Sequence, residues 1–228
     1  MKNSKDLSCL EEAIGYRFSN RQLLERALTH TSYSNEHAVP SYERLEFLGD
    51  AVLQIIITDH LYHQFEAEAE GTLTTMRKNL VSKPPLARIA EEISLGEYLS
   101  LGKGEDAAGG RHNATILADV FESLMAAIYL DGGIERVKAV LLRLMRDELL
   151  QSAENKGADY KTRLQQLIEQ DGKETLEYVV AKKEGPEHKP LYVINAVISG
   201  NIVGSGRGGS KHEAEQMAAK EALRWFHP

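Results

Sequence analysis

Two pairs of acidic residues stand in segments of this chain that are otherwise strongly apolar. Glu46 and Asp50 lie four residues apart in ERLEFLGDAVL. Asp119 and Glu122 lie three residues apart in TILADVFESLMAAIYL, where they are the only charged residues. On a helix, either spacing places both side chains on the same face. Carboxylates this close repel each other, and burying one without a partner is costly, so we expect a compensating positive charge.

That charge could be a divalent metal ion. If the two helices faced each other, four carboxylates would converge, and carboxylate oxygens are the ligands that Mg²⁺ and Mn²⁺ prefer. Such an ion also positions phosphate oxygens and lowers the pKa of a water molecule that it binds, which is the basis of metal-assisted phosphodiester hydrolysis. The alternative is that each acid pairs with a nearby arginine, such as Arg44 or Arg77, or lies on a solvated helix face.

The spacing of apolar residues predicts the elements that must hold these acids. Through the first two-thirds of the chain, apolar residues recur at intervals of three and four, which is typical of helices. The glycine-rich residues 102–110 are expected to form a loop, and the polar stretch SAENKGA, residues 152–158, a linker between domains. The predicted helices are Leu7–Ile14, Asn20–Thr29, Glu43–Phe65, Glu70–Val81, Pro84–Ile93, Thr115–Leu130 and Ile134–Gln151.

After the linker the pattern changes to one that mixes helices with alternating strands. The predicted elements are a helix over Tyr160–Asp171, strands over Thr175–Lys182, Leu191–Ser199 and Ile202–Gly206, and a helix over Glu213–Phe226. The expected fold is therefore multidomain. An all-α domain over residues 1–151 is followed by the linker 152–158 and by a small α+β domain of order α-β-β-β-α over residues 159–228.

Composition separates the two domains further and limits the protein's location. The 228 residues carry a formal charge of −7, yet residues 159–228 hold ten basic and ten acidic side chains, so the acidity lies in the helical domain. Cys9 is the only cysteine, which excludes an intramolecular disulfide and a cysteine-based zinc site and fits a reducing compartment. Because the chain shows neither a long apolar span nor an apolar secretory segment, we expect a cytoplasmic protein with no membrane partner.

The segment ERLEFLGDAVL resembles the signature segment of ribonuclease III, the family of endonucleases that cut double-stranded RNA. The similarity continues through ALTHTSY, EGTLTTMRKNLV, LGEYLSLGKGE and GGRHNATILADVFESLMAAIYLDGG. The terminal α+β unit resembles a double-stranded-RNA-binding domain. The resemblance covers essentially the whole chain in order, and motifs of this length are far more specific than a four-residue pattern.

The resemblance implies roles for the acids. Asp50 and Glu122 fall at the positions of the catalytic acids. The implied metal ligands are Glu46, Asp50, Asp119 and Glu122, and the implied cofactor is Mg²⁺, for which Mn²⁺ could substitute. Glu43 and Glu70 match acids near the site and are expected to support the ligands or to contact RNA, although either could be a plain surface charge. The resemblance also implies a homodimer with Phe47 at the interface, unless Phe47 belongs to the protomer's own core.

The resemblance further implies three RNA-contacting surfaces in the terminal domain. The first helix contributes Thr162 and Gln166, and the loop EGPEHKP contributes His188. The start of the last helix contributes Ser210, Lys211 and His212, where a helix N-terminus favours phosphate. His212 departs from the family, which usually has lysine there, so we expect weaker attraction for phosphate.

The expected function is metal-dependent cleavage of both strands of double-stranded RNA. The family implies 5′-phosphate and 3′-hydroxyl ends with short 3′ overhangs, and the processing of precursor ribosomal RNA and structured transcripts. Double-stranded RNA, rather than a small molecule, is the expected substrate. The alternative is a non-catalytic double-stranded-RNA-binding dimer that uses a nuclease-like domain only for assembly.

Overall fold

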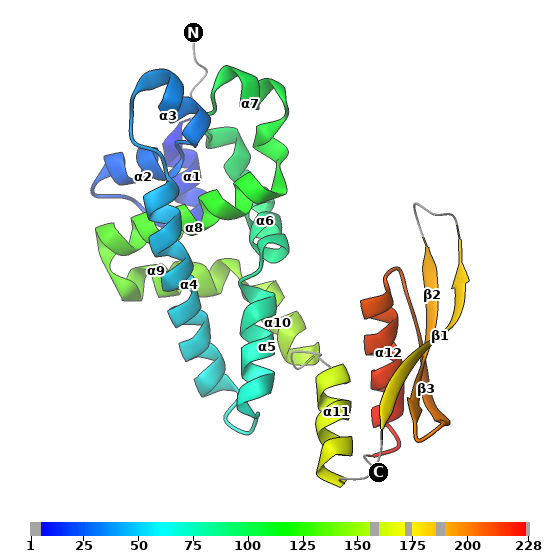
Figure 1. The fold of residues 1–228 in the computed structure, drawn as a ribbon. Coiled ribbons are helices and arrows are strands. Elements are labelled where there is room, and N and C mark those ends of the chain that lie inside the picture. The colour runs from blue at the N-terminus through cyan, green and yellow to red at the C-terminus, as the bar shows by residue number, and fades with distance from the viewer. Residues whose placement is uncertain (1–5, 156–159, 172–174, 186–189, 227–228) are drawn as a thin grey trace. The chain divides into compact units, whose positions relative to one another are not determined.

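The chain folds into two compact units. The computed structural model describes residues 6–155, 160–171, 175–185 and 190–226. The units comprise Met1–Gly157 and Ala158–Pro228. The first is helical and the second combines a sheet with two helices (Figure 1), which confirms the predicted fold class. Within the described residues, no helix is both long and apolar enough to cross a membrane.

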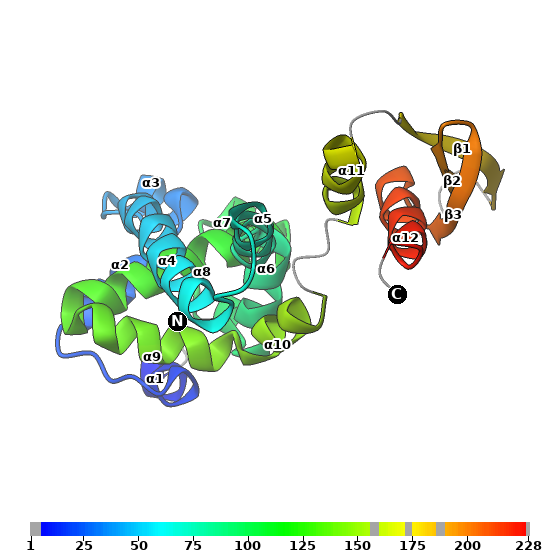
Figure 2. The same ribbon diagram turned by 90° about the horizontal axis from the view of Figure 1, so that it is seen from below.

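The helices of the first unit surround one core, with α4 and α8 at its centre. Both are long, and they share the most extensive helix contact of the unit (Figures 1 and 2). Phe121 on α8 and Leu53 and Ile56 on α4 are among the large side chains that are fully buried. In the described residues the helices are α1 (Leu7–Ile14), α2 (Arg21–Ala27), α3 (Thr31–His37), α4 (Glu43–Gln64), α5 (Glu70–Leu80), α6 (Lys83–Glu92), α7 (Lys103–Ala107), α8 (Ala114–Gly132), α9 (Ile134–Leu144) and α10 (Arg146–Asn155), with short 3₁₀ turns over Leu95–Tyr98 and Gly110–His112.

A glycine brings α4 and α8 unusually close. A β-carbon added at Gly49 would overlap the backbone carbonyl oxygen of Glu122. Only a residue without a side chain permits this crossing, and the acids of both helices stand directly beside it. At the start of α8, the Asn113 side chain accepts hydrogen bonds from the N–H groups of Thr115 and Ile116, which fixes where that helix begins.

The helical unit differs from the sequence-based expectation in three places. Helix α3 was not predicted, because TSYSNEH has no apolar face and buries no residue. The glycine-rich segment 102–110 was expected to be a loop, but it contains α7. The predicted helix Ile134–Gln151 is two helices that meet at Met145, and α10 continues to Asn155, so four residues of the expected linker are helical.

The second unit is a three-stranded antiparallel sheet with helices on one face. Strands β1 (Leu176–Glu184), β2 (Leu191–Ile198) and β3 (Asn201–Gly208) pair in chain order. Helix α12 (Lys211–Leu223) packs on β2 and β3, and α11 (Tyr160–Asp171) packs on α12 (Figure 2). A tight turn joins β2 to β3, and Ser199 and Gly200 both adopt the positive φ angles that such a turn requires.

Glycine on β3 and alanine on α12 form the tightest contact of this unit. Gly204, Gly206 and Gly208 are buried at alternate positions of β3, so all three point toward the helix. A β-carbon on Gly206 would overlap the backbone of Ala214 and Ala218. The strand and the helix therefore touch backbone to backbone.

Replacing Gly206 with alanine should destabilise this unit. Overpacking of a tight core typically costs about 1–3 kcal/mol of unfolding free energy. In a domain this small, each kcal/mol lowers the melting temperature by roughly 4–8 °C. Thermal unfolding would measure it. Gly209→Ala is the matched control, since a β-carbon there meets only Glu213 at ordinary contact distance. Equal melting temperatures for the two variants would contradict the packing described.

Candidate active site

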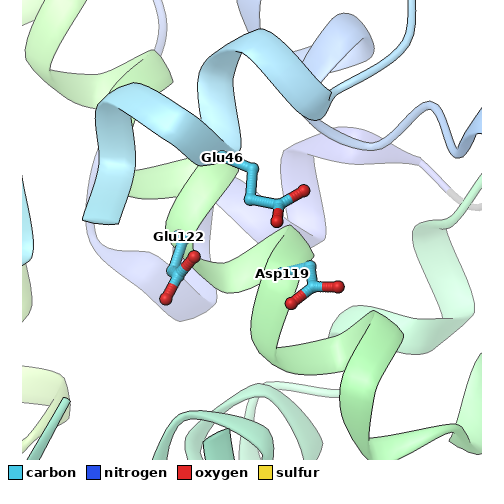
Figure 3. A group of neighbouring side chains, drawn as sticks. All are labelled: Glu46, Asp119 and Glu122. Atoms are coloured by element: carbon cyan, nitrogen blue, oxygen red, sulfur yellow. The ribbon is translucent and has the colours of Figure 1, made fainter. Parts of the chain in front are cut away.

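Three of the four acids singled out by sequence gather where α4 and α8 cross. Glu46 comes from α4, and Asp119 and Glu122 come from α8 (Figure 3). One carboxylate oxygen of each lies within 4.8 Å of the others, and all three side chains are partly buried. Helices α4 and α8 thus face each other, with the acids turned toward a shared space.

Asp50 lies beside this group with its carboxylate turned to its own helix. Both of its oxygens accept hydrogen bonds of 3.0 Å from the Gln54 amide, one turn further along α4. Its charge nevertheless reaches Glu122, where it is the largest electrostatic contribution after burial to the raised pKa. Asp50 is therefore an electrostatic neighbour of the three-acid group.

Burial and mutual repulsion perturb the acids strongly. Burial, followed by the charges of Asp50, Asp119 and Glu46, raises the pKa of Glu122 to about 8. Burial and then the charge of Asp119 also raise the pKa of Glu46. At neutral pH Glu122 is therefore mostly protonated, because its surroundings do not neutralise the charge that the fully ionised group would carry.

One positive side chain already enters the group. Lys83, the first residue of α6, donates a hydrogen bond of 2.9 Å from Nζ to Oδ1 of Asp119. That hydrogen bond is the main cause of the raised pKa of Lys83. Among the described residues, the basic side chain that contacts this acid group is Lys83, through Asp119. Arg77, considered from sequence, instead donates to the Thr58 hydroxyl at 3.3 Å. Lys83 lies 36 residues before Asp119, so no helical spacing in the sequence links the two. The one unusual feature of Lys83 in the sequence is its place at the start of a helix, just before two prolines, where a positive charge is unfavourable.

Tyr42 is a second neighbour that the sequence did not indicate. It is buried directly before α4, and its ring forms part of the core. Burial, then the charges of Asp119, Glu46 and Glu43, raise the pKa of its hydroxyl, so it stays protonated beside the acids.

The residues present fit a hard divalent cation. All the available donors are carboxylate oxygens, the ligand type that such ions select, and no softer nitrogen or sulfur donor belongs to the group among the described residues. The pKa of about 8 for Glu122 reflects burial first and then the negative charges of the neighbouring acids, which the single charge of Lys83 does not offset.

The stability of the metal-free protein should therefore fall as pH rises from about 4.5 to about 8. The pKa of Glu122 rises from 4.5 to about 8 on folding, so in this window the folded state holds a proton that the unfolded chain has lost. Differential scanning calorimetry in EDTA would measure the fall, and added Mg²⁺ should reverse it at the alkaline end. The Glu122→Gln variant should lose most of this dependence. A melting temperature that climbs across the window would contradict the assignment.

The remaining predicted residues of the helical unit lie at its surface. Glu43 is exposed and accepts a 2.9 Å hydrogen bond from the Ser41 hydroxyl, and its charge contributes to the raised pKa of Glu46. Glu70 is the exposed first residue of α5 and accepts a 2.7 Å hydrogen bond from the Thr74 hydroxyl. Phe47 is 83% exposed, so it is not a residue of the protomer's own core.

In the second unit the predicted RNA contacts fall on α11 and on the start of α12. Thr162 is exposed on α11. Ser210 caps α12 by accepting from the Glu213 N–H at 3.2 Å, while Glu213 accepts from the Gly209 N–H at 2.8 Å, an arrangement close to a capping box. Lys211 and His212 are exposed in the first turn of α12. The side chain of Gln166 and all of His188 lie outside the described residues.

Comparison with known proteins gives the same two-part division. Residues 20–149 match the family described as Ribonuclease-III-like, and residues 160–225 match the double-stranded RNA binding motif. The chain is 42% identical over 217 residues to Ribonuclease 3 of Listeria monocytogenes, covering 94% of this chain and 95% of that protein. It is 45% identical over 225 residues to Ribonuclease 3 of Dehalococcoides mccartyi, covering 97% and 95% respectively.

A solved structure resembles the first unit. The nuclease domain of ribonuclease III from Campylobacter jejuni aligns with a TM-score of 0.60 and 37% identity, covering 63% of this chain and 98% of that one. The two family matches, the relatives that cover nearly the full length and the similar nuclease-domain structure all indicate the same family. The chain belongs to the ribonuclease III family and is an endoribonuclease that acts on double-stranded RNA.

Proposed function

We propose that this endoribonuclease depends on Mg²⁺ and hydrolyses both strands of its RNA duplex at the three-acid group. We propose that its products carry 5′-phosphate and 3′-hydroxyl ends with short 3′ overhangs. The observation that carries the proposal is the meeting of Glu46, Asp119 and Glu122, from two helices, within 4.8 Å. Mn²⁺, which prefers the same oxygen donors, is expected to substitute.

Glu46, Asp119 and Glu122 would hold the ion, with Asp50 as a further ligand if its carboxylate turns from Gln54. When bound, the ion would position phosphate oxygens and stabilise the charge that develops on the phosphodiester. Asp50 and Glu122 are the proposed catalytic acids. The hydrogen bonds that Asp50 accepts from Gln54 hold its carboxylate at one side of α4, near enough to Glu122 for its charge to act there. A carboxylate in that place is suited to accept a proton from the attacking water.

The second unit would hold the duplex. We infer that Thr162, Gln166, His188, Ser210, Lys211 and His212 contact RNA, and that Glu43 and Glu70 support the ligands or meet RNA near the cut. The exposure of Thr162, Lys211 and His212 supports this for those three. The domain bounds we propose remain 1–151 for the nuclease, 152–158 for the linker and 159–228 for the RNA-binding domain. Precursor ribosomal RNA and structured messenger RNA in the cytoplasm are the proposed substrates.

We further infer a homodimer formed through α4. Phe47 and Ile55 are 83% and 59% exposed, and they lie on one face of α4 with Ala51, also exposed, between them. Large apolar side chains aligned on one exposed helix face are typical of a subunit interface. A dimer would supply two cutting centres, one for each strand.

Replacing Phe47 with aspartate should convert the dimer to monomers. A buried interfacial aromatic commonly contributes about 2 kcal/mol or more to association, and a desolvated carboxylate would add a further penalty, so we expect affinity between protomers to fall by about 30-fold or more. Sedimentation velocity over a concentration series would measure it. Ile202→Asp, at an exposed apolar position of β3, should leave the association state unchanged. A Phe47→Asp protein that sediments as the wild type would overturn the interface.

The alternative of a binding-only dimer does not account for the acids, because carboxylates close to phosphate weaken binding. The test is incubation of an end-labelled RNA duplex with the protein in Mg²⁺, in Mg²⁺ with excess EDTA, and with a DNA duplex of the same sequence. The proposal expects metal-dependent cutting of RNA alone, with product ends identified by phosphatase and ligase treatment. Cutting that persists in EDTA would refute the metal centre, and blunt products would refute the staggered cleavage.

A further inference from the structure

Lys83 contacts the acid group from a position that is unfavourable for a lysine in a helix. Lys83 occupies the first turn of α6, where the helix dipole disfavours a positive charge. Its side chain is 58% exposed, whereas the Asp119 side chain that it contacts is 16% exposed. The contact thus joins a solvated cation to a largely buried acid. The position of Lys83 is therefore explained by its interaction with the acids and not by the stability of α6.

The charge of Lys83 acts on more than its direct partner. Asp119 receives the hydrogen bond, and Glu46 and Glu122 both feel the ammonium, whose charge opposes the rise in the pKa of each. One monovalent side chain therefore faces the same three carboxylates that would bind a divalent ion. Both cations cannot use the contacted oxygen of Asp119 at once.

We propose that Lys83 is a positioning residue that holds Asp119 in the metal-free enzyme and competes with the divalent ion for it. This inference rests on the proposed function. An exposed lysine loses little on leaving an acid for water, because ion pairs at the surface are weak. A divalent ion attracts the same carboxylates more strongly, so binding displaces the ammonium toward solvent. In the metal-free protein Lys83 stabilises the acids, and by competing with the ion it lowers the affinity of the protein for metal.

Metal binding by the RNA-free protein tests this directly. Free Mn²⁺, measured by electron paramagnetic resonance in a titration, gives the affinity of the full chain without any cleavage assay. Lys83→Gln should bind Mn²⁺ about tenfold more tightly than the wild type, within the usual range of coupling between two ligands. Lys83→Arg, which keeps the charge, should stay near the wild type. Lys78→Gln, an exposed lysine of α5, changes the net charge equally and is the matched control.

Thermal unfolding provides a second readout. In EDTA, Lys83→Gln should melt below the wild type because the acids lose their only contacted cation among the described residues. At saturating Mn²⁺ the difference should vanish. A purely structural ion pair would instead lower the melting temperature equally with and without the ion, and that result would overturn the proposal.

The outcomes separate this inference from the proposed function. If Glu122→Gln abolishes Mn²⁺ binding but Lys83→Gln binds like Lys78→Gln, the metal centre stands and the competition is refuted. If the wild type and Glu122→Gln bind Mn²⁺ equally, the metal centre itself is refuted. Weaker Mn²⁺ binding by Lys83→Gln than by the wild type would also overturn the competition, since it would mean that Lys83 favours binding of the ion.

Discussion

Replacing Glu122 with glutamine should reduce the rate of RNA cleavage by about 10³-fold, the scale expected when a group that stabilises charge in the transition state is lost. Glutamine keeps the size of the side chain but cannot supply the carboxylate charge that we propose Glu122 presents to the ion. Glu122 is also the residue on which burial and the other three acids act together, which raises its pKa to about 8. The loss should therefore appear in the chemical step.

Single-turnover cleavage of a labelled duplex in saturating Mg²⁺ measures that step, and binding of the uncut duplex in Ca²⁺ measures affinity separately. Affinity for RNA should stay within a few-fold of the wild type. Glu135→Gln, an exposed acid at the start of α9, removes the same charge elsewhere and should cut normally. Cleavage by Glu122→Gln at the wild-type rate would refute its role.

Replacing Gly49 with alanine should damage both stability and activity. The new β-carbon would overlap the carbonyl oxygen of Glu122, so α4 and α8 must move apart. Overpacking costs about 1–3 kcal/mol, and the gain in helix propensity, about 1 kcal/mol, offsets only part of it. Since Glu46 and Asp50 flank Gly49, a displacement of about 1 Å would also spread the acids, which can cost roughly 10²-fold in rate.

Urea unfolding and single-turnover cleavage of the same preparation distinguish the two effects. Gly104→Ala is the control, because a β-carbon there meets nothing within 4 Å. Measuring the rate well below the melting temperature ensures that the loss belongs to folded protein. A variant as stable and as active as Gly104→Ala would show that the crossing tolerates a side chain.

The sequence predicted the fold class because its patterns are local and strong. Helical spacing identified the two acid-bearing helices, and the same-face position of each acid pair follows from that spacing alone. That Glu46 meets Asp119 and Glu122 depends on the close crossing at Gly49, which is a tertiary contact that periodicity does not encode. The metal and catalytic roles of the acids remain predictions.

What the sequence could not show has specific physical causes. Lys83 reaches Asp119 across 36 residues, so only the packing of α6 against α8 brings them together. The Asp50 carboxylate turns to Gln54 because the side chain one turn along the helix offers a nearby amide donor. Helix α3 has no apolar period, and its first turn is capped by the His30 ring, which accepts from the Ser32 N–H. Such contacts are set by side-chain conformation and leave no periodic signal.

The glycine and alanine contact between β3 and α12 has a consequence for how the RNA-binding domain can evolve. Where large side chains fill a core, neighbouring substitutions can compensate for one another, and the backbone drifts as they do. Gly206 has no side chain that a neighbouring substitution could compensate for, and the backbones of Ala214 and Ala218 already lie against it. Along this contact we therefore expect substitutions to be tolerated mainly at the outward-facing positions of β3 and α12. Affinity for different RNA duplexes can be retuned there while the strand and helix keep one fixed spacing.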